Sequence, residues 1–220
     1  MVLDDRLGSD LRQAAPLFLP TAAIGVTFGA LAEPVMGPWA PIVMSVVVFA
    51  GSAQFAALSV LAAGGGFAPA TLAGLLMNAR FLPMGLAVAS SFRGNRFARV
   101  LQGQTIVDAS FALASAGDGT FDRRRLFTAT AVQGAGWWLG TVTGVLVGAS
   151  IPAPEAFGLD VIFPAFYLAL LWPELKTPVR KVIALLGAAL TLVLTPVLPA
   201  GLPILAAGLA ALVGLKWADR

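Results

Sequence analysis

Residues 34–79, PVMGPWAPIVMSVVVFAGSAQFAALSVLAAGGGFAPATLAGLLMNA, decide the fold because no charged side chain interrupts them. A helix that crosses the hydrocarbon core of a bilayer, roughly 30 Å thick, needs about 20 apolar residues. The stretch is therefore too long for one span, and the triple glycine at residues 64–66 divides it. We predict one span at residues 39–63 and a second at residues 67–92.

The rest of the chain repeats this pattern. Apolar runs predict five further spans, at residues 14–32, 126–151, 159–175, 182–198 and 201–217, with charged residues only near the ends of the third and fifth. The last two share the run 182–215, which would make a helix of roughly 51 Å at 1.5 Å per residue. Pro196, Pro199 and Pro203 interrupt that run, and proline breaks helices. Residues 105–116 are too few for a span and carry Asp108, so a re-entrant or interfacial segment suits them better.

These runs predict an all-α protein, a polytopic transmembrane helical bundle of about seven spans, some of them broken or re-entrant. Residues 1–220 then form a single membrane domain. Three apolar segments precede the Arg-rich stretch at residues 93–99 and at least three follow it. Residues 49–51 and 163–165 disrupt corresponding segments, so the two halves are a candidate inverted repeat.

Composition supports a membrane protein and excludes several functions. Hydrophobic residues make up 58% of the chain and charged residues only 11%, against roughly 25% in soluble domains. The chain has no cysteine and no histidine, which excludes disulfides, thiolate metal sites and the Ser/His/Asp and Cys/His forms of catalysis. We expect no enzyme, no cofactor and no resident metal. The N-terminus does not read as a secretory signal.

The net charge of +3 reflects membrane topology rather than nucleic-acid binding. Lys and Arg gather in cytoplasmic loops of membrane proteins. With seven spans and the C-terminus inside, the inside loops hold most of the 14 basic residues: Arg93, Arg96, Arg99, Arg123, Arg124, Arg125, Lys176, Arg180, Lys181, Lys216 and Arg220. A span at 105–116 would move the N-terminus inside but leave the C-terminal half unchanged. We expect a multi-pass protein of the cytoplasmic (inner) membrane.

Small and polar residues mark the first two spans. Gly25 and Gly29 stand four apart, a spacing that lets helices pack closely. Gly51 and Ser52 weaken the second span, and Gln54 adds an amide there. Transporters often bind substrate at such broken helices. The alternative is a glutamine that only hydrogen-bonds a neighbouring helix.

Charged residues in the apolar segments are stronger indicators of function. A charge at the bilayer centre costs about 2.5–3.5 kcal/mol, so Arg80, which follows Asn78 by two residues, needs a partner. That partner is either Asp108, permanently, or the carboxylate of a substrate, transiently. Asp108 is itself either a proton or ligand site or a helix-capping residue in a cytoplasmic loop.

Three motifs in this order resemble the AzlC family of branched-chain amino acid permeases and exporters. They are Phe-Gly-Ala-Leu-Ala at residues 28–32, Met-Ser-Val-Val-Val-Phe-Ala-Gly-Ser-Ala-Gln-Phe at residues 44–55, and Asn-Ala-Arg at residues 78–80. The family often has Thr-Asp-Glu before Phe-Ala-Leu. Here Val107-Asp108-Ala109 stands near that place, so only Asp108 remains of the acidic pair.

The resemblance implies proton-driven export of hydrophobic amino acids such as leucine, isoleucine, valine or methionine, together with a small membrane subunit of the AzlD type. A zwitterionic substrate needs a partner for each charge. Asn78, Arg80 and the backbone at Gly51 and Ser52 are candidates for the carboxylate, and Gln54 or Asp108 for the ammonium. Asp108 is also the candidate for proton coupling. The alternatives are a non-transporting membrane assembly or scaffold protein and, less favoured, an intramembrane enzyme.

Overall fold

The computed structural model describes residues 2–148, 168, 171–198 and 202–212. Across these residues the chain is all-α, as predicted, apart from one isolated antiparallel bridge between Ser115 and Phe121. The helices are α1 (Val2–Ala14), η1 (Ala15–Leu17), α2 (Phe18–Met36), α3 (Trp39–Val47), α4 (Gly51–Ala62), α5 (Phe67–Asn78), α6 (Phe81–Val88), η2 (Ala89–Ser91), α7 (Arg96–Gly103), α8 (Asp108–Ala114), α9 (Arg123–Val147), η5 (Trp172–Glu174), α11 (Pro178–Leu194) and α12 (Leu202–Gly208).

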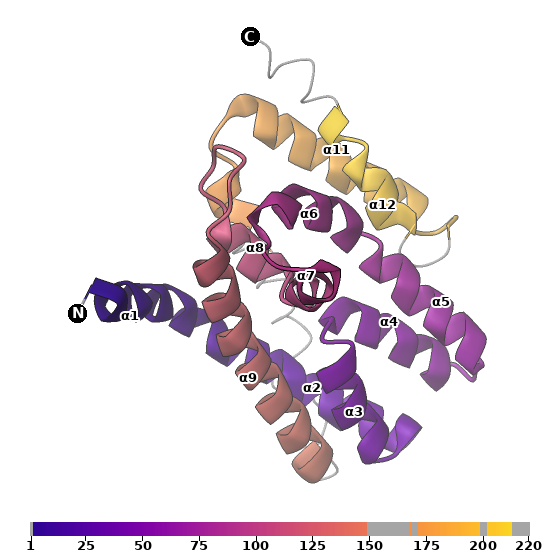
Figure 1. Ribbon diagram of the computed structural model, residues 1–220. Coiled ribbons are helices and arrows are strands. Elements are labelled where there is room, and N and C mark those ends of the chain that lie inside the picture. Colours follow the sequence, from indigo (N-terminus) through magenta and orange to yellow (C-terminus); the bar gives the residue numbers. More distant parts are fainter. Residues whose placement is uncertain (1, 149–167, 169–170, 199–201, 213–220) are drawn as a thin grey trace.

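Helices α2 and α9 lie against each other along much of their length (Figure 1). Glycines on both helices bring the two backbones into contact. A Cβ atom at Gly25 would lie 2.7 Å from the carbonyl oxygen of Trp137, and one at Gly144 would overlap the carbonyl oxygen of Val26. No larger residue fits at such distances, so the spacing of Gly25 and Gly29 is a packing motif, as predicted.

The second predicted span, residues 39–63, is broken. Helix α3 ends at Val47 and α4 begins at Gly51. Between them Phe49 has a positive φ of 43° and Ala50 is extended, with φ −142° and ψ 90°. A bulky residue with positive φ is strained and must be held by its surroundings. The break therefore lies just before the Gly51–Ser52 pair that predicted it.

The third predicted span, residues 67–92, is also interrupted. Helices α5 and α6 meet at an angle of 41° around residues 79 and 80. Helices α4 and α5 pack as neighbours, joined by the triple glycine that divides the run (Figure 1). Gly64 has φ 79° there, a conformation that side chains with a Cβ rarely adopt. The polar Asn-Ala-Arg motif thus sits at a helix break instead of inside a continuous helix.

Residues 93–122 contain more helix than the sequence suggested. The Arg-rich stretch includes α7, and residues 105–116 contain α8, which has seven residues and falls far short of a span.

Near the N-terminus, α1 is attached to α9 through Asp10. This buried carboxylate lies 2.6 Å from Arg124 Nε and 3.6 Å from Arg125 Nε.

The breaks explain why few helices are long enough to cross a bilayer alone. Within the described residues only the continuous helix Arg6–Met36 has the required length and hydropathy, and the bent α5–α6 pair adds a second if it counts as one span. The count of seven spans therefore stays a prediction. Residues 159–167 of the fifth predicted span, the segment 163–165 of the candidate repeat and residues 213–217 of the last span lie outside the described residues.

Large apolar side chains are exposed on many helices. Trp39 is 75% exposed, Phe67 84% and Leu86 80%. Soluble proteins rarely expose apolar patches that extend over many elements. This surface fits an environment of lipid or of neighbouring membrane helices.

Candidate functional site

The helix breaks meet at one small cavity of about 60 Å³. A cavity of this size is large enough to admit water and small enough to hold only a few atoms of a ligand. Its lining comes from the α3–α4 break (Phe49, Ala50 and Gly51), the α5–α6 bend (Arg80 and Phe81), the start of α8 (Val107, Asp108 and Ala109), α2 (Thr21 and Ile24) and α9 (Gln133 and Trp137).

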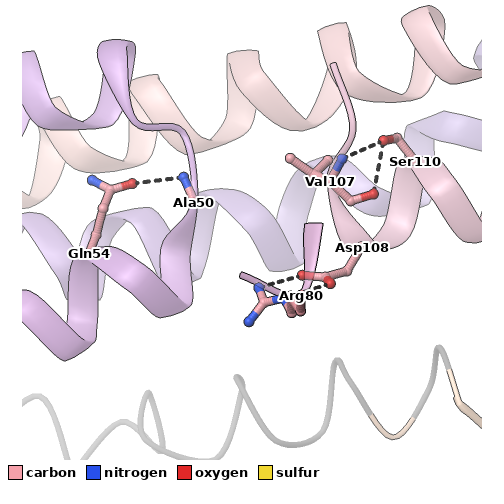
Figure 2. A network of polar contacts seen from close by, with 6 residues as sticks. All are labelled: Ala50, Gln54, Arg80, Val107, Asp108 and Ser110. Atoms are coloured by element: carbon pink, nitrogen blue, oxygen red, sulfur yellow. Dashed lines mark hydrogen bonds and ion pairs between the residues drawn. The ribbon is translucent and has the colours of Figure 1, made fainter. Parts of the chain in front are cut away.

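Arg80 and Asp108 form a two-point ion pair at this cavity (Figure 2). Arg80 Nε donates to Asp108 Oδ1 at 3.1 Å, and Nη2 donates to Oδ2 at 2.8 Å. The guanidinium carbon lies 4.9 Å from the centre of the Phe81 ring. Of the two partners predicted for Arg80, the structure contains Asp108. The Asp108 carboxylate is directed toward Arg80, which stands at the N-terminus of α6, and Asp108 itself lies in the first turn of α8.

The pair is mostly, but not fully, enclosed. The Arg80 side chain is 17% exposed and that of Asp108 24%. Paired groups of opposite charge that line a cavity are positioned to bind a ligand that carries both charges. Such a pair can therefore bind a zwitterion, or hold the α5–α6 bend against the start of α8, or do both.

Gln54 has a structural position behind the cavity. Its side chain is completely buried, its Nε2 donates to Ser45 Oγ at 3.0 Å, and its Oε1 accepts from the Ala50 N–H at 3.3 Å. Ser45 Oγ also lies 3.0 Å from Thr141 Oγ1 on α9. The network ties the broken segment to α9. Gln54 does hydrogen-bond a neighbouring helix, and it does not line the cavity.

Two helix starts at the cavity are stabilised in the same way (Figure 2). The N-cap residues, Ala50 for α4 and Val107 for α8, have no polar side chain. Gln54 accepts the Ala50 N–H, and Ser110 Oγ accepts the Val107 N–H at 3.1 Å. In each helix a side chain of the first turn therefore accepts the N–H of the N-cap residue. These hydrogen bonds hold Gly51 and Asp108 at the cavity wall.

The structure brings together only some of the predicted substrate residues. Gly51, Arg80 and Asp108 share the cavity, whereas Ser52 and Gln54 do not line it. Asn78 lines a separate, mainly apolar cavity of about 270 Å³ between α3, α4 and α5. The Asn-Ala-Arg motif thus places its two polar side chains in different cavities.

Two site residues were missed from the sequence. Gln133 and Trp137 of α9 line the cavity and are only 5% and 4% exposed. Among the described residues, Gln133 Oε1 and Trp137 Nε1 have no hydrogen-bond partner. The amide of Gln133 in an apolar segment is a signal of the same kind as Gln54.

The described residues contain no cluster of three acidic side chains that could hold a metal ion.

The fold and the site define a helical membrane protein with a charged site between broken helices. The chain belongs to the AzlC family, because the family described as "AzlC protein" matches residues 16–151, more than half of the chain. This confirms the resemblance seen in the motifs. The match covers α2 through α9 and therefore every residue of the candidate site.

Two relatives from Helicobacter pylori are each described as an uncharacterized membrane protein. The one from strain J99 is 25% identical over 181 residues, which cover 80% of this chain and 79% of the relative. The one from strain 26695 is 24% identical over 153 residues, which cover 68% and 67%. No solved structure matches the chain.

Proposed function

We propose that this chain is the large subunit of a secondary transporter that exports branched-chain or other hydrophobic amino acids across the cytoplasmic membrane. Membership in the AzlC family supports transport rather than catalysis. The observation that carries the proposal is the Arg80–Asp108 pair in a small cavity where the α3–α4 break, the α5–α6 bend and the start of α8 meet. Transporters commonly place substrate sites at such discontinuous helices.

The charges of the pair match those of an amino acid. In the proposed complex the guanidinium of Arg80 binds the substrate carboxylate, and the carboxylate of Asp108 binds the ammonium. The backbone N–H groups at the start of α4, beside Gly51, add donors for the carboxylate. Ile24 and Phe81 add apolar surface at this small cavity, against which an aliphatic side chain packs where it leaves the cavity.

Asp108 is also the proposed site of proton coupling. A carboxylate binds either an ammonium group or a proton, so the two compete at Asp108. A proton that enters from outside neutralises Asp108 and weakens its hold on the substrate ammonium, which favours release outside. Return of the proton to the cytoplasm restores the carboxylate. This competition exchanges one substrate molecule for one proton. Entry of the proton down its gradient then drives export of the substrate.

We further propose that transport requires a small AzlD-like membrane subunit and that the Arg-rich loops face the cytoplasm. Efflux of preloaded leucine, isoleucine, valine or methionine from cells tests the function, in cells that express this chain with and without such a subunit. We expect efflux of at least one of them when both subunits are present. Absence of efflux for all four, with both subunits in the membrane, would instead favour an assembly protein. The close packing of α2 against α9 is compatible with that function too.

A further inference from the structure

Helix α9 contributes two residues to the cavity lining that each carry an unsatisfied buried polar atom, and neither has a role in the amino acid binding proposed above. Gln133 Oε1 is an acceptor and Trp137 Nε1 is a donor, and neither has a hydrogen-bond partner among the described residues. Both side chains are more than nine-tenths buried and line the cavity with Arg80 and Asp108. Buried polar groups are nearly always paired in folded proteins. Two exceptions at one cavity indicate a ligand that supplies the missing partners.

The two residues are placed to contact one small molecule. They stand four apart on α9, so their Cβ atoms lie about 5–6 Å from each other on one helix face. The Trp137 ring is fixed by stacking on Phe28, with ring centres 5.8 Å apart and planes inclined by 22°. Its Nε1–H therefore has a defined direction. The cavity, of about 60 Å³, is small, so it admits a few polar atoms and not an entire large ligand.

We infer that Gln133 and Trp137 are substrate-binding residues: Trp137 Nε1 donates a hydrogen bond to the carboxylate of an α-amino acid, and Gln133 Oε1 accepts one from its ammonium. This inference rests on the proposed transport function and extends its site to α9. Each charge of the substrate then has one charged side chain, Arg80 or Asp108, and one neutral side chain as partners, in addition to the backbone donors near Gly51. The ligand class is an α-amino acid that carries both groups.

The unpaired state of these atoms gives the inference a distinctive test. Gln133→Met and Trp137→Phe remove an unsatisfied buried atom while keeping most of the side-chain volume. We therefore expect Gln133→Met to keep its thermal stability, and Trp137→Phe to lose only what the smaller ring costs in the core around Phe28. If the atoms bind substrate, both variants nevertheless lose affinity. A residue with a purely structural role would not lose substrate affinity in a variant that stays folded.

The neighbouring Trp138 provides a matched control. Its Nε1 donates to the backbone oxygen of Ser45 at 3.0 Å, and it does not line the cavity. Trp138→Phe removes the same indole N–H from the next residue of the same helix. We expect it to lower thermal stability through the lost hydrogen bond and to leave leucine affinity unchanged.

The measurement is the dissociation constant of leucine for the purified full-length chain and the three variants, together with their melting temperatures. We expect Gln133→Met and Trp137→Phe each to weaken binding by about 10- to 100-fold, as expected for hydrogen bonds to charged groups. Gln133→Glu keeps an acceptor for the ammonium and should bind more tightly than Gln133→Met.

The outcomes separate this inference from the proposed function. If wild-type protein binds leucine and both variants bind it equally well, the inference is wrong and the proposed function stands. If both variants lose affinity only because they unfold, as their melting temperatures would show, the inference is also wrong. If the wild-type chain binds none of leucine, isoleucine, valine and methionine, with or without the small subunit, the proposed function fails and the inference fails with it.

Discussion

Breaking the Arg80–Asp108 pair has a cost that the structure allows us to bracket. Removing one partner of a fully buried ion pair costs about 3–5 kcal/mol, because the other charge is left unpaired. Exposed pairs contribute about 0.2–1 kcal/mol. With side chains 17% and 24% exposed and two hydrogen bonds between them, this pair lies closer to the buried limit. We expect Asp108→Ala to lower the free energy of unfolding by about 2–3 kcal/mol.

The double variant tests whether the loss comes from the pair. Arg80→Ala should destabilise by a similar amount, and Arg80→Ala with Asp108→Ala should cost much less than the sum, a coupling of about 2 kcal/mol. Unfolding by sodium dodecyl sulfate in mixed detergent micelles measures these free energies. The exposed pair Arg180–Glu174, at 2.9 Å with side chains 48% and 57% exposed, is the matched control. A coupling at Arg80–Asp108 no larger than at this control pair would refute the reasoning.

Three further predictions follow from the packing and the topology. Gly144→Val should prevent α2 and α9 from packing and abolish recovery of monodisperse protein, whereas Gly103→Val should be tolerated because a Cβ at Gly103 meets no atom within 4 Å. Gln54→Leu should lower the free energy of unfolding by about 1–3 kcal/mol, because the buried Ala50 N–H loses its partner. Cysteines introduced singly at Arg96 and Lys176 should react with an impermeant reagent only from the cytoplasmic side, and labelling from outside would show the topology to be wrong.

Much of the fold was predictable because its signals are local. The triple glycine at 64–66 supplies the positive φ that the turn needs, and Gly51 marks the segment where the helix restarts. The spacing of Gly25 and Gly29 indicates close packing from sequence alone. Each of these residues acts through its own backbone. No long-range contact had to be known to interpret them.

The division of the Asn-Ala-Arg motif was not predictable. Residues two apart on a helix point to different sides, and the bend between α5 and α6 increases the separation. Asn78 and Arg80 therefore enter different cavities, although both were predicted to bind one carboxylate. Their adjacency in sequence suggested a shared site that the backbone geometry does not provide.

The roles of buried amides also depend on tertiary contacts. Gln54 and Gln133 are alike in sequence, since each is an amide in an apolar segment. In the structure Gln54 is satisfied by Ser45 and Ala50, whereas Gln133 lines the cavity with an unpaired oxygen. Only the packing of α9 against α2 and the broken segment distinguishes them. The sequence does not predict helix α7, because its arginines are typical of a loop between spans.

Proton-driven transport of leucine by proteoliposomes that contain this chain and a small AzlD-like subunit tests the central claim most directly. With a pH gradient imposed, the wild-type protein should move leucine against its concentration gradient, and a protonophore should abolish this. The Asp108→Asn variant should still exchange leucine across the membrane, with weaker affinity. Because its amide cannot bind and release a proton, it should not accumulate leucine against a gradient. Two results would contradict the account: accumulation of leucine by Asp108→Asn to the wild-type level, or wild-type transport that does not depend on the pH gradient.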